Sequence, residues 1–434
     1  MILKEGKVSQ LTRFGLVFVC VVLSAFCVSA ADKPFAGTTL TWICSEQPAT
    51  DAAKALLPEF EEQTGIKVNL DIMDEVRMLE KLELDKSSKT ALYDIVSIES
   101  TWIALFMKDQ IIYPIDDLIM DPSLPVRGGD LADFPTALIN EQCLRDGKLW
   151  MIPFGLGASM LAIRSDWFKE AGIADPKTWP ELISAAQKLM KKDKDGKVTR
   201  YGISLRGLRG IHSAYIFYCI GQPLGLEFLD SAMKPMLNNE QGRAALKMYV
   251  ELSKYAPAGM TTFTHEEAAT TFNKGLAAMF LDNSTLLGWV DRELHGKVRY
   301  IPIPKASGYP AISSLSGWGL GVHADSKNKN AATMFVEFMT AKRNAGKIFA
   351  AGGPAERISL LTDKKLAAAN PLFGYQLSRY KIAKFAWPKL VEIPEWNDIV
   401  GKYVTEALAG ARTPASASEA MNNDLAKMLK EAGY

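Results

Sequence analysis

The chain has 434 residues, more than one hydrophobic core usually serves, so two domains are expected. It carries 50 Lys and Arg against 49 Asp and Glu, and this near-neutral balance argues against a nucleic-acid or membrane-surface partner. Its 9 Trp and 13 Tyr are ample for a carbohydrate site, although most of them are expected in the core.

Residues 1–31 have the pattern of a secretory signal peptide. Three basic residues precede an apolar segment, residues 14–27, and the small residues Val28-Ser29-Ala30 suit a cleavage site. The apolar segment is shorter than the roughly 20 residues that a membrane span needs. The alternative is an uncleaved membrane anchor. Cys27 does not indicate a lipoprotein, because the bulky Phe26 precedes it. We therefore predict export to the periplasm as a soluble protein.

Cysteine and histidine are used sparingly after the leader. Cys44, Cys143 and Cys219 contain no Cys-x-x-Cys spacing and allow at most one disulfide, and we favour buried thiols. The four histidines are scattered, so neither a metal nor a cofactor is expected. Residues 191–197 resemble a calcium loop superficially, but the glycine is misplaced and a hairpin turn is predicted.

Strand-like and helix-like patterns alternate between residues 40 and 98. Apolar runs at residues 40–44 and 94–98 and strict alternation at residues 66–72 predict three strands. Amphipathic segments at residues 51–64 and 74–86 predict the helices between them. This order implies a doubly wound parallel sheet.

Ligands of such sheets bind beyond the carboxyl ends of the strands. Glu46 follows the first predicted strand, and Glu99 and Trp102 follow the third. The two carboxylates can accept hydrogen bonds from sugar hydroxyls, and Trp102 offers an apolar face. The alternative for both carboxylates is to complement the dipole of the following helix.

A second group of predicted elements follows Met160, where a further strand begins. Strands are expected at residues 200–205 and 276–281, and helices at 240–255 and 265–274. Arg206 and Arg209 follow the first of these strands, flanked by glycines, and are placed to donate paired hydrogen bonds into a cleft. Structural ion pairs are the alternative.

Residues 313–353 predict a turn, a short strand and one helix that ends at Gly352-Gly353-Pro354. In Gly317-Trp318-Gly319, the flanking glycines leave an indole face uncovered, which suits a sugar ring. A core tryptophan with tightly packed glycines is the alternative.

Five segments resemble, in the same chain order, the extracellular solute-binding proteins of ABC transporters. The last of them, SGWGLGVHADSKNKNAATMFVEFMT, looks like a signature of the large sugar- and polyol-binding group (family 1, maltose-binding-protein-like). The others are residues 93–119, 148–173, 178–189 and 272–284. Together the five segments span nearly all of the chain after the leader.

The resemblance implies an α/β fold, the two-lobed periplasmic binding protein of type II. Each lobe is then a doubly wound sheet flanked by helices, with the ligand cleft between the lobes. The first lobe is expected at 32–154 and 283–312, and the second at 155–282 and 313–434. Three crossings between the lobes would form a hinge that permits closure around a ligand.

The resemblance also adds candidate ligand-binding residues. It implies that Asp282 and Trp318 lie at the cleft and that Arg357 reaches it, although this chain inserts Glu356 where many relatives read proline, alanine and arginine directly. Phe154 lies on the segment that leaves the first lobe. The full candidate set is Glu46, Glu99, Trp102, Phe154, Arg206, Arg209, Asp282, Trp318 and Arg357.

The function that the resemblance implies is capture of a sugar or sugar alcohol by a monomer that delivers it to an ABC transporter permease. A sugar acid or phosphorylated polyol is an alternative, because the three candidate arginines could neutralise it. A secreted carbohydrate-active enzyme would need two carboxylates across a scissile bond, and no catalytic motif supports it. No enzyme activity is expected, and the sequence does not reveal which sugar binds.

Overall fold

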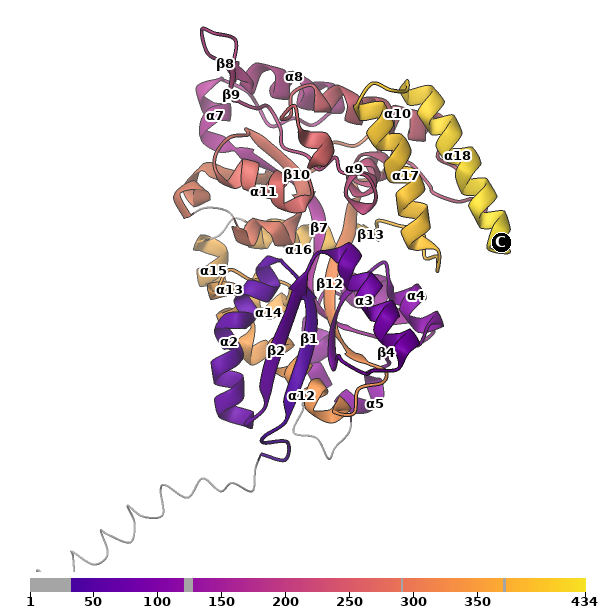
Figure 1. Ribbon diagram of the computed structural model, residues 1–434. Coiled ribbons are helices and arrows are strands. Elements are labelled where there is room, and N and C mark those ends of the chain that lie inside the picture. Colours follow the sequence, from indigo (N-terminus) through magenta and orange to yellow (C-terminus); the bar gives the residue numbers. More distant parts are fainter. Residues whose placement is uncertain (1–32, 121–127, 290–291, 370–371) are drawn as a thin grey trace, which may run out of the picture.

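The structure is a computed structural model that describes residues 33–120, 128–289, 292–369 and 372–434. The expected signal peptide, residues 1–31, lies outside the described residues. Figure 1 shows two halves stacked on one another and joined by the long strands β7 (Ile152–Arg164) and β12 (Ser313–His323). We call the half that contains the N-terminal strands the first half, and the other the second half.

The first half is organised around three parallel strands. β1 (Thr39–Ser45) lies between β2 (Lys67–Met73) and β3 (Ile95–Glu99). Helices α2 (Pro48–Thr64) and α3 (Glu75–Ser88) connect them. This is the strand-helix alternation that the hydrophobic pattern predicts, and it is confirmed.

The three parallel strands belong to a larger mixed sheet of order β10-β7-β12-β3-β1-β2. β12 pairs antiparallel with both β3 and β7, so it links the two halves. Gly155 and Gly317 have φ values of 110° and 119°, and a Cβ at Gly317 would lie 2.2 Å from the Gly155 carbonyl oxygen. These two positions therefore require glycine, because the strands approach too closely there for a side chain.

The second half covers the far end of β7 with two antiparallel strands and a group of helices. β10 (Met279–Asn283) and β11 (Val298–Ile301) pair with β7. The helices α9 (Ile211–Gly221), α10 (Glu240–Ser253), α17 (Ile393–Leu408) and α18 (Pro414–Glu431) contact one another, and α11 (His265–Asn273) contacts β10.

The single helix expected between residues 329 and 351 is wrong, because two helices occupy this segment. α12 (Lys329–Thr340) and α13 (Lys342–Ala350) are separated by Ala341, whose φ of −59° and ψ of 142° are not helical. A side chain of α13 stabilises this break, because Asn344 donates a hydrogen bond of 2.8 Å to the Phe338 carbonyl at the end of α12.

Contacts bear on how the chain divides between the halves. β11 pairs with β7 in the second half, whereas α12 and α13 contact α2 in the first half. We therefore propose that residues 298–301 belong with the second half and residues 329–350 with the first, each opposite to the division expected from the resemblance.

Two smaller predictions are confirmed. Residues 191–197 lie in a hairpin between β8 (Lys191–Lys192) and β9 (Val198–Arg200), and Cys44, Cys143 and Cys219 are buried free thiols. Within the described ranges, no cluster of His, Cys, Asp and Glu is arranged to hold a metal ion. None of the helices described there is both long and apolar enough to cross a membrane.

Candidate functional site

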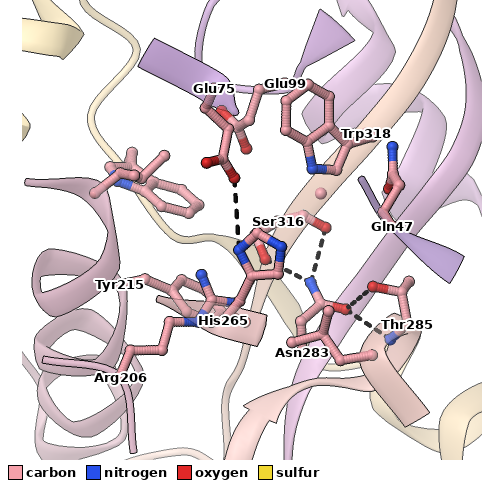
Figure 2. Close-up of a pocket in the computed structure, with 14 residues that line it drawn as sticks. Gln47, Glu75, Glu99, Arg206, Tyr215, His265, Asn283, Thr285, Ser316 and Trp318 are labelled. Carbon is pink, nitrogen blue, oxygen red and sulfur yellow. Dashed lines mark hydrogen bonds and ion pairs between the residues drawn. The ribbon is translucent and has the colours of Figure 1, made fainter. Parts of the chain in front are cut away.

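A pocket with about 490 Å³ of space free of atoms, part of it open to solvent, lies between the two halves (Figure 2). Three of its lining residues come from consecutive parallel strands of the first half. Gln47 follows β1, Glu75 follows β2 as the first residue of α3, and Glu99 ends β3. The carboxyl ends of parallel strands meet at one edge, so chain order alone brings these three polar side chains together.

Glu99 is a buried carboxyl group with local hydrogen-bond donors. The Thr101 backbone N–H donates a hydrogen bond of 2.7 Å to Oε2, and the Thr101 and Ser100 hydroxyls also donate to the carboxylate. Burial raises the pKa of Glu99 to about 7, although these donors oppose the shift. The group can therefore accept a ligand hydroxyl when ionised or donate a hydrogen bond when protonated.

Trp318 lies opposite Glu99 across the β12–β3 ladder and lines the pocket beside it. The Trp102 ring meets the Trp318 indole edge-on, with centroids 5.4 Å apart and an interplanar angle of 86°. Trp102 does not line the pocket, and it therefore acts as a support that fixes the orientation of Trp318.

Arg206 is held by a carboxylate from the second half. Its Nε donates a hydrogen bond of 2.8 Å to Asp282 Oδ2, and its Nη2 donates to Oδ1. Burial works against the charged guanidinium, but Asp282 outweighs it and the pKa of Arg206 is raised. Arg206 also lies over the Tyr215 ring, 4.8 Å from its centroid. The Arg206 guanidinium therefore lines the pocket, and the buried Asp282 carboxylate neutralises its charge.

The second half adds aromatic and amide groups to the pocket. Trp387 stacks on Tyr215 with centroids 5.4 Å apart and an interplanar angle of 15°. Asn283, at the end of β10, donates from Nδ2 to the Ser316 carbonyl and hydroxyl oxygens and accepts from the Thr285 N–H and hydroxyl. Figure 2 shows Asn283 facing the same space as Trp318 and Glu99.

Two buried polar atoms of the pocket lack hydrogen-bond partners of good geometry within the described residues. They are Gln47 Nε2 and the Tyr215 hydroxyl oxygen. Buried polar groups are normally satisfied, and leaving one without a partner costs about 1–3 kcal/mol. Both atoms belong to residues that line the pocket, so a polar ligand could supply the missing partners.

The family model described as bacterial extracellular solute-binding protein matches residues 45–346. The chain belongs to this family. An ABC transporter solute-binding protein from Agrobacterium radiobacter K84, solved in complex with ribitol, is similar with a TM-score of 0.84 and 28% identity, covering 91% of this chain and all of that one.

Two curated relatives extend the comparison. The mannitol-binding protein of Pseudomonas aeruginosa is 26% identical over 400 residues, which cover 86% of this chain and 89% of the relative. A probable amino-acid ABC transporter periplasmic-binding protein of Sinorhizobium fredii is 24% identical over 412 residues, 93% of this chain and 92% of the relative. The predicted two-lobed α/β fold of a solute-binding protein is thus confirmed.

Three of the nine candidate residues line the pocket of this solute-binding protein: Glu99, Arg206 and Trp318. Two more support them from behind, because Asp282 pairs with Arg206 and Trp102 packs against Trp318. The pocket therefore gathers residues from the ends of strands that are far apart in the sequence.

The other four candidates lie elsewhere in the solute-binding protein. Glu46 is exposed and does not line the pocket, although its neighbour Gln47 does. Phe154 packs against Trp42 in the first half, with ring centroids 6.4 Å apart. Arg209 forms an exposed ion pair of 2.7 Å with Asp398, so the alternative of a structural ion pair applies to it.

Arg357 is buried in the first half, away from the pocket. Its Nε donates a hydrogen bond of 2.8 Å to the Thr340 carbonyl, its Nη1 donates one of 3.0 Å to the Asp130 carbonyl, and the guanidinium lies 4.1 Å from the Phe134 ring centroid. The inserted Glu356 instead faces the crossing strand, accepting hydrogen bonds from the Gly155 and Leu156 N–H groups.

Several pocket residues were absent from the candidate set drawn from the sequence. Gln47 and Asn283 each follow a candidate residue, Glu46 and Asp282, in the sequence. The rule that ligands bind at strand ends therefore predicts the right segments but misses the lining residue by one position. Glu75 could have been found by the same rule, since it follows the strand expected at residues 66–72. No local signal marks Trp387, which reaches the pocket from a loop after β13 (Ala383–Phe385).

Proposed function

We propose that this solute-binding protein captures an uncharged polyhydroxy compound, a sugar or sugar alcohol, and delivers it to the permease of an ABC transporter. The observation that carries the proposal is the pairing of an indole face, Trp318, with a buried hydrogen-bonding carboxyl, Glu99, on adjacent strands. Sugars and polyols combine C–H faces with many hydroxyls, and such a pocket complements both. The names of the relatives in complex with ribitol and binding mannitol support this ligand class.

Charge favours a neutral ligand over an anionic one. Arg206 is neutralised by Asp282, whereas Glu75 and Glu99 add acidic groups to the pocket lining. Arg209 and Arg357, the other arginines that could neutralise an anion, do not line the pocket. A sugar acid or phosphorylated polyol would therefore meet acidic groups without a free cationic partner.

The arrangement supports binding without chemistry. Catalytic hydrolysis of a glycoside needs two carboxyl groups on opposite sides of the bond that breaks. Asp282, the candidate carboxylate of the second half, accepts two hydrogen bonds from Arg206 instead. We accordingly infer a monomeric periplasmic carrier rather than an enzyme, released after removal of residues 1–31.

A thermal-shift screen of the mature chain, residues 32–434, tests the proposal. The panel holds ribitol, D-mannitol, neutral sugars, sugar acids, sugar phosphates and amino acids, the last because of the name of the Sinorhizobium relative. A ligand at 100 times its dissociation constant stabilises the folded state by about 2.7 kcal/mol, which raises the melting temperature measurably. A shift with a neutral polyol or sugar supports the proposal, and a shift only with charged compounds contradicts it.

A further inference from the structure

Glu75 contacts two histidines of the opposite half. Glu75 is the first residue of α3 in the first half, whereas His212 and His265 lie in the first turns of α9 and α11 in the second half (Figure 1). Glu75 Oε1 lies 3.5 Å from His265 Nδ1, and Glu75 Oε2 lies 3.9 Å from His212 Nε2. Figure 2 shows the Glu75–His265 contact at the edge of the pocket.

The three side chains form one compact group. The two imidazole rings lie 5.8 Å apart, and the side chains of Glu75, His212 and His265 are 17%, 9% and 10% exposed. Glu75 and His265 line the pocket, but His212 does not. Because the carboxylate comes from one half and both rings from the other, separation of the halves would break both contacts.

We propose that Glu75, His212 and His265 form a clasp that holds the two halves closed over a bound ligand and that releases them in acid. The clasp concerns closure of the same pocket and rests on the proposed function only in taking that pocket as the ligand site. It adds a conformational control that ligand contacts alone would not provide.

The charge states of the group account for the acid response. Burial works against the ionised carboxylate, but the nearby His265 and Arg206 outweigh it and hold the pKa of Glu75 below its usual value. Burial lowers the pKa of His212 to about 4, with Glu75 opposing. His212 is therefore neutral while the halves are closed, and its Nδ1 has no hydrogen-bond partner among the described residues.

Opening would return His212 to water, where a histidine titrates near about 6.5. The open form then binds a proton that the closed form excludes. Closure is fully supported above about pH 6.5 and is lost as the pH falls toward about 4. The charged groups that face the clasp are Arg206, Glu266 and Glu267 from the second half and Glu99 from the first.

Two variants and a matched control test the clasp. His212→Asn removes a clasp residue that does not touch the pocket, and Glu75→Gln removes the shared carboxylate in case the first variant fails to fold. The control is His323→Gln, because His323 Nε2 makes a similar buried contact, 3.6 Å from Asp85 Oδ2, within the first half.

The fraction of closed molecules can be measured with one nitroxide label on each half, because pulsed electron paramagnetic resonance gives the distance between the two labels. Leu84→Cys on α3 and Leu276→Cys before β10 provide exposed sites, since these side chains are 66% and 45% exposed, while the native cysteines are buried. The mature protein is measured at pH 7.5 and pH 5, without ligand and with ribitol as the probe.

We expect Glu75→Gln to lower the ratio of closed to open molecules by about tenfold at pH 7.5, within the usual range for coupled sites. His212→Asn should change this ratio less at pH 7.5, because the ring that it removes is neutral there, and should act mainly on the response to acid. Wild type should open at pH 5, His212→Asn should respond less to pH, and His323→Gln should behave as wild type. Equal closed fractions in wild type and His212→Asn under every condition would overturn the clasp. A wild type that ignores ribitol but opens in acid would count against the ligand class while keeping the clasp.

Discussion

Trp318 and Glu99 stand directly opposite each other on the antiparallel strands β12 and β3. Directly opposed side chains on one face of a sheet have Cβ atoms about 4.5–5.5 Å apart, so a ligand can contact both together. The two residues come from distant parts of the sequence, and the crossing strand brings them together. The apolar and polar contacts of the pocket thus share one rigid support.

Trp318→Ala should weaken binding of a polyol or sugar at least fivefold. Loss of an aromatic platform removes about 0.5–1.5 kcal/mol beyond the area that it buries. Isothermal titration calorimetry at pH 7.5 measures the change, and Trp318→Phe, which keeps a ring, should lose less. An affinity of Trp318→Ala within twofold of wild type would show that Trp318 serves only the core.

Glu356→Gln should flatten the dependence of stability on pH. Burial raises the pKa of Glu356 to about 8 from an ordinary 4.5, so the folded protein holds a proton that the unfolded chain releases between these values. Stability linked to this group is fully present below about pH 4.5 and is lost as the pH rises to about 8, by roughly 1–3 kcal/mol.

Melting temperatures between pH 5 and pH 9 check this prediction. Glutamine retains an acceptor for the Gly155 and Leu156 N–H groups, so the variant should fold. Glu431→Gln, which removes a carboxylate that is 65% exposed near the end of α18, is the control and should keep the wild-type slope. A wild-type slope in Glu356→Gln would contradict the assignment.

The sequence predicts the fold of the first half well because local patterns decide it there. The apolar run of β1, the alternation of β2 and the buried run of β3 each mark a strand without reference to distant residues. The break at Ala341 had no such signal, since it depends on tertiary packing that lets Asn344 bond the Phe338 carbonyl.

The candidate site was predictable where a residue follows a strand end or is flanked by glycines, as Glu99, Arg206 and Trp318 are. Pairing between distant residues was not predictable. The resemblance implies that Asp282 lies at the cleft, but Asp282 is buried beside Arg206 and the ion pair is its main contact. Trp387 lines the pocket because of how the loop that carries it packs, and no periodic pattern in the sequence predicts that packing.

Arg209→Ala should leave ligand affinity unchanged and alter stability by less than about 1 kcal/mol, as is usual for exposed ion pairs. Arg209 and Asp398 are 52% and 55% exposed and their pair lies outside the pocket lining. Titration with a polyol and urea unfolding measure both quantities. A loss of affinity above fivefold would place Arg209 at the ligand after all.

Asp282→Ala should destabilise the fold strongly as well as weaken binding. The Asp282 side chain is fully buried and that of Arg206 is 11% exposed, so removal of the carboxylate leaves a guanidinium without its partner in the interior. Breaking a buried pair in this way costs about 3–5 kcal/mol, whereas replacing both partners by apolar residues of similar size costs much less.

Urea unfolding of Asp282→Ala, Arg206→Met and the double variant Arg206→Met/Asp282→Leu tests this difference. The double variant should be more stable than Asp282→Ala yet bind polyols weakly, because the pocket has lost a donor. If Asp282→Ala instead kept wild-type stability and lost only affinity, Asp282 would act on the ligand directly rather than through Arg206.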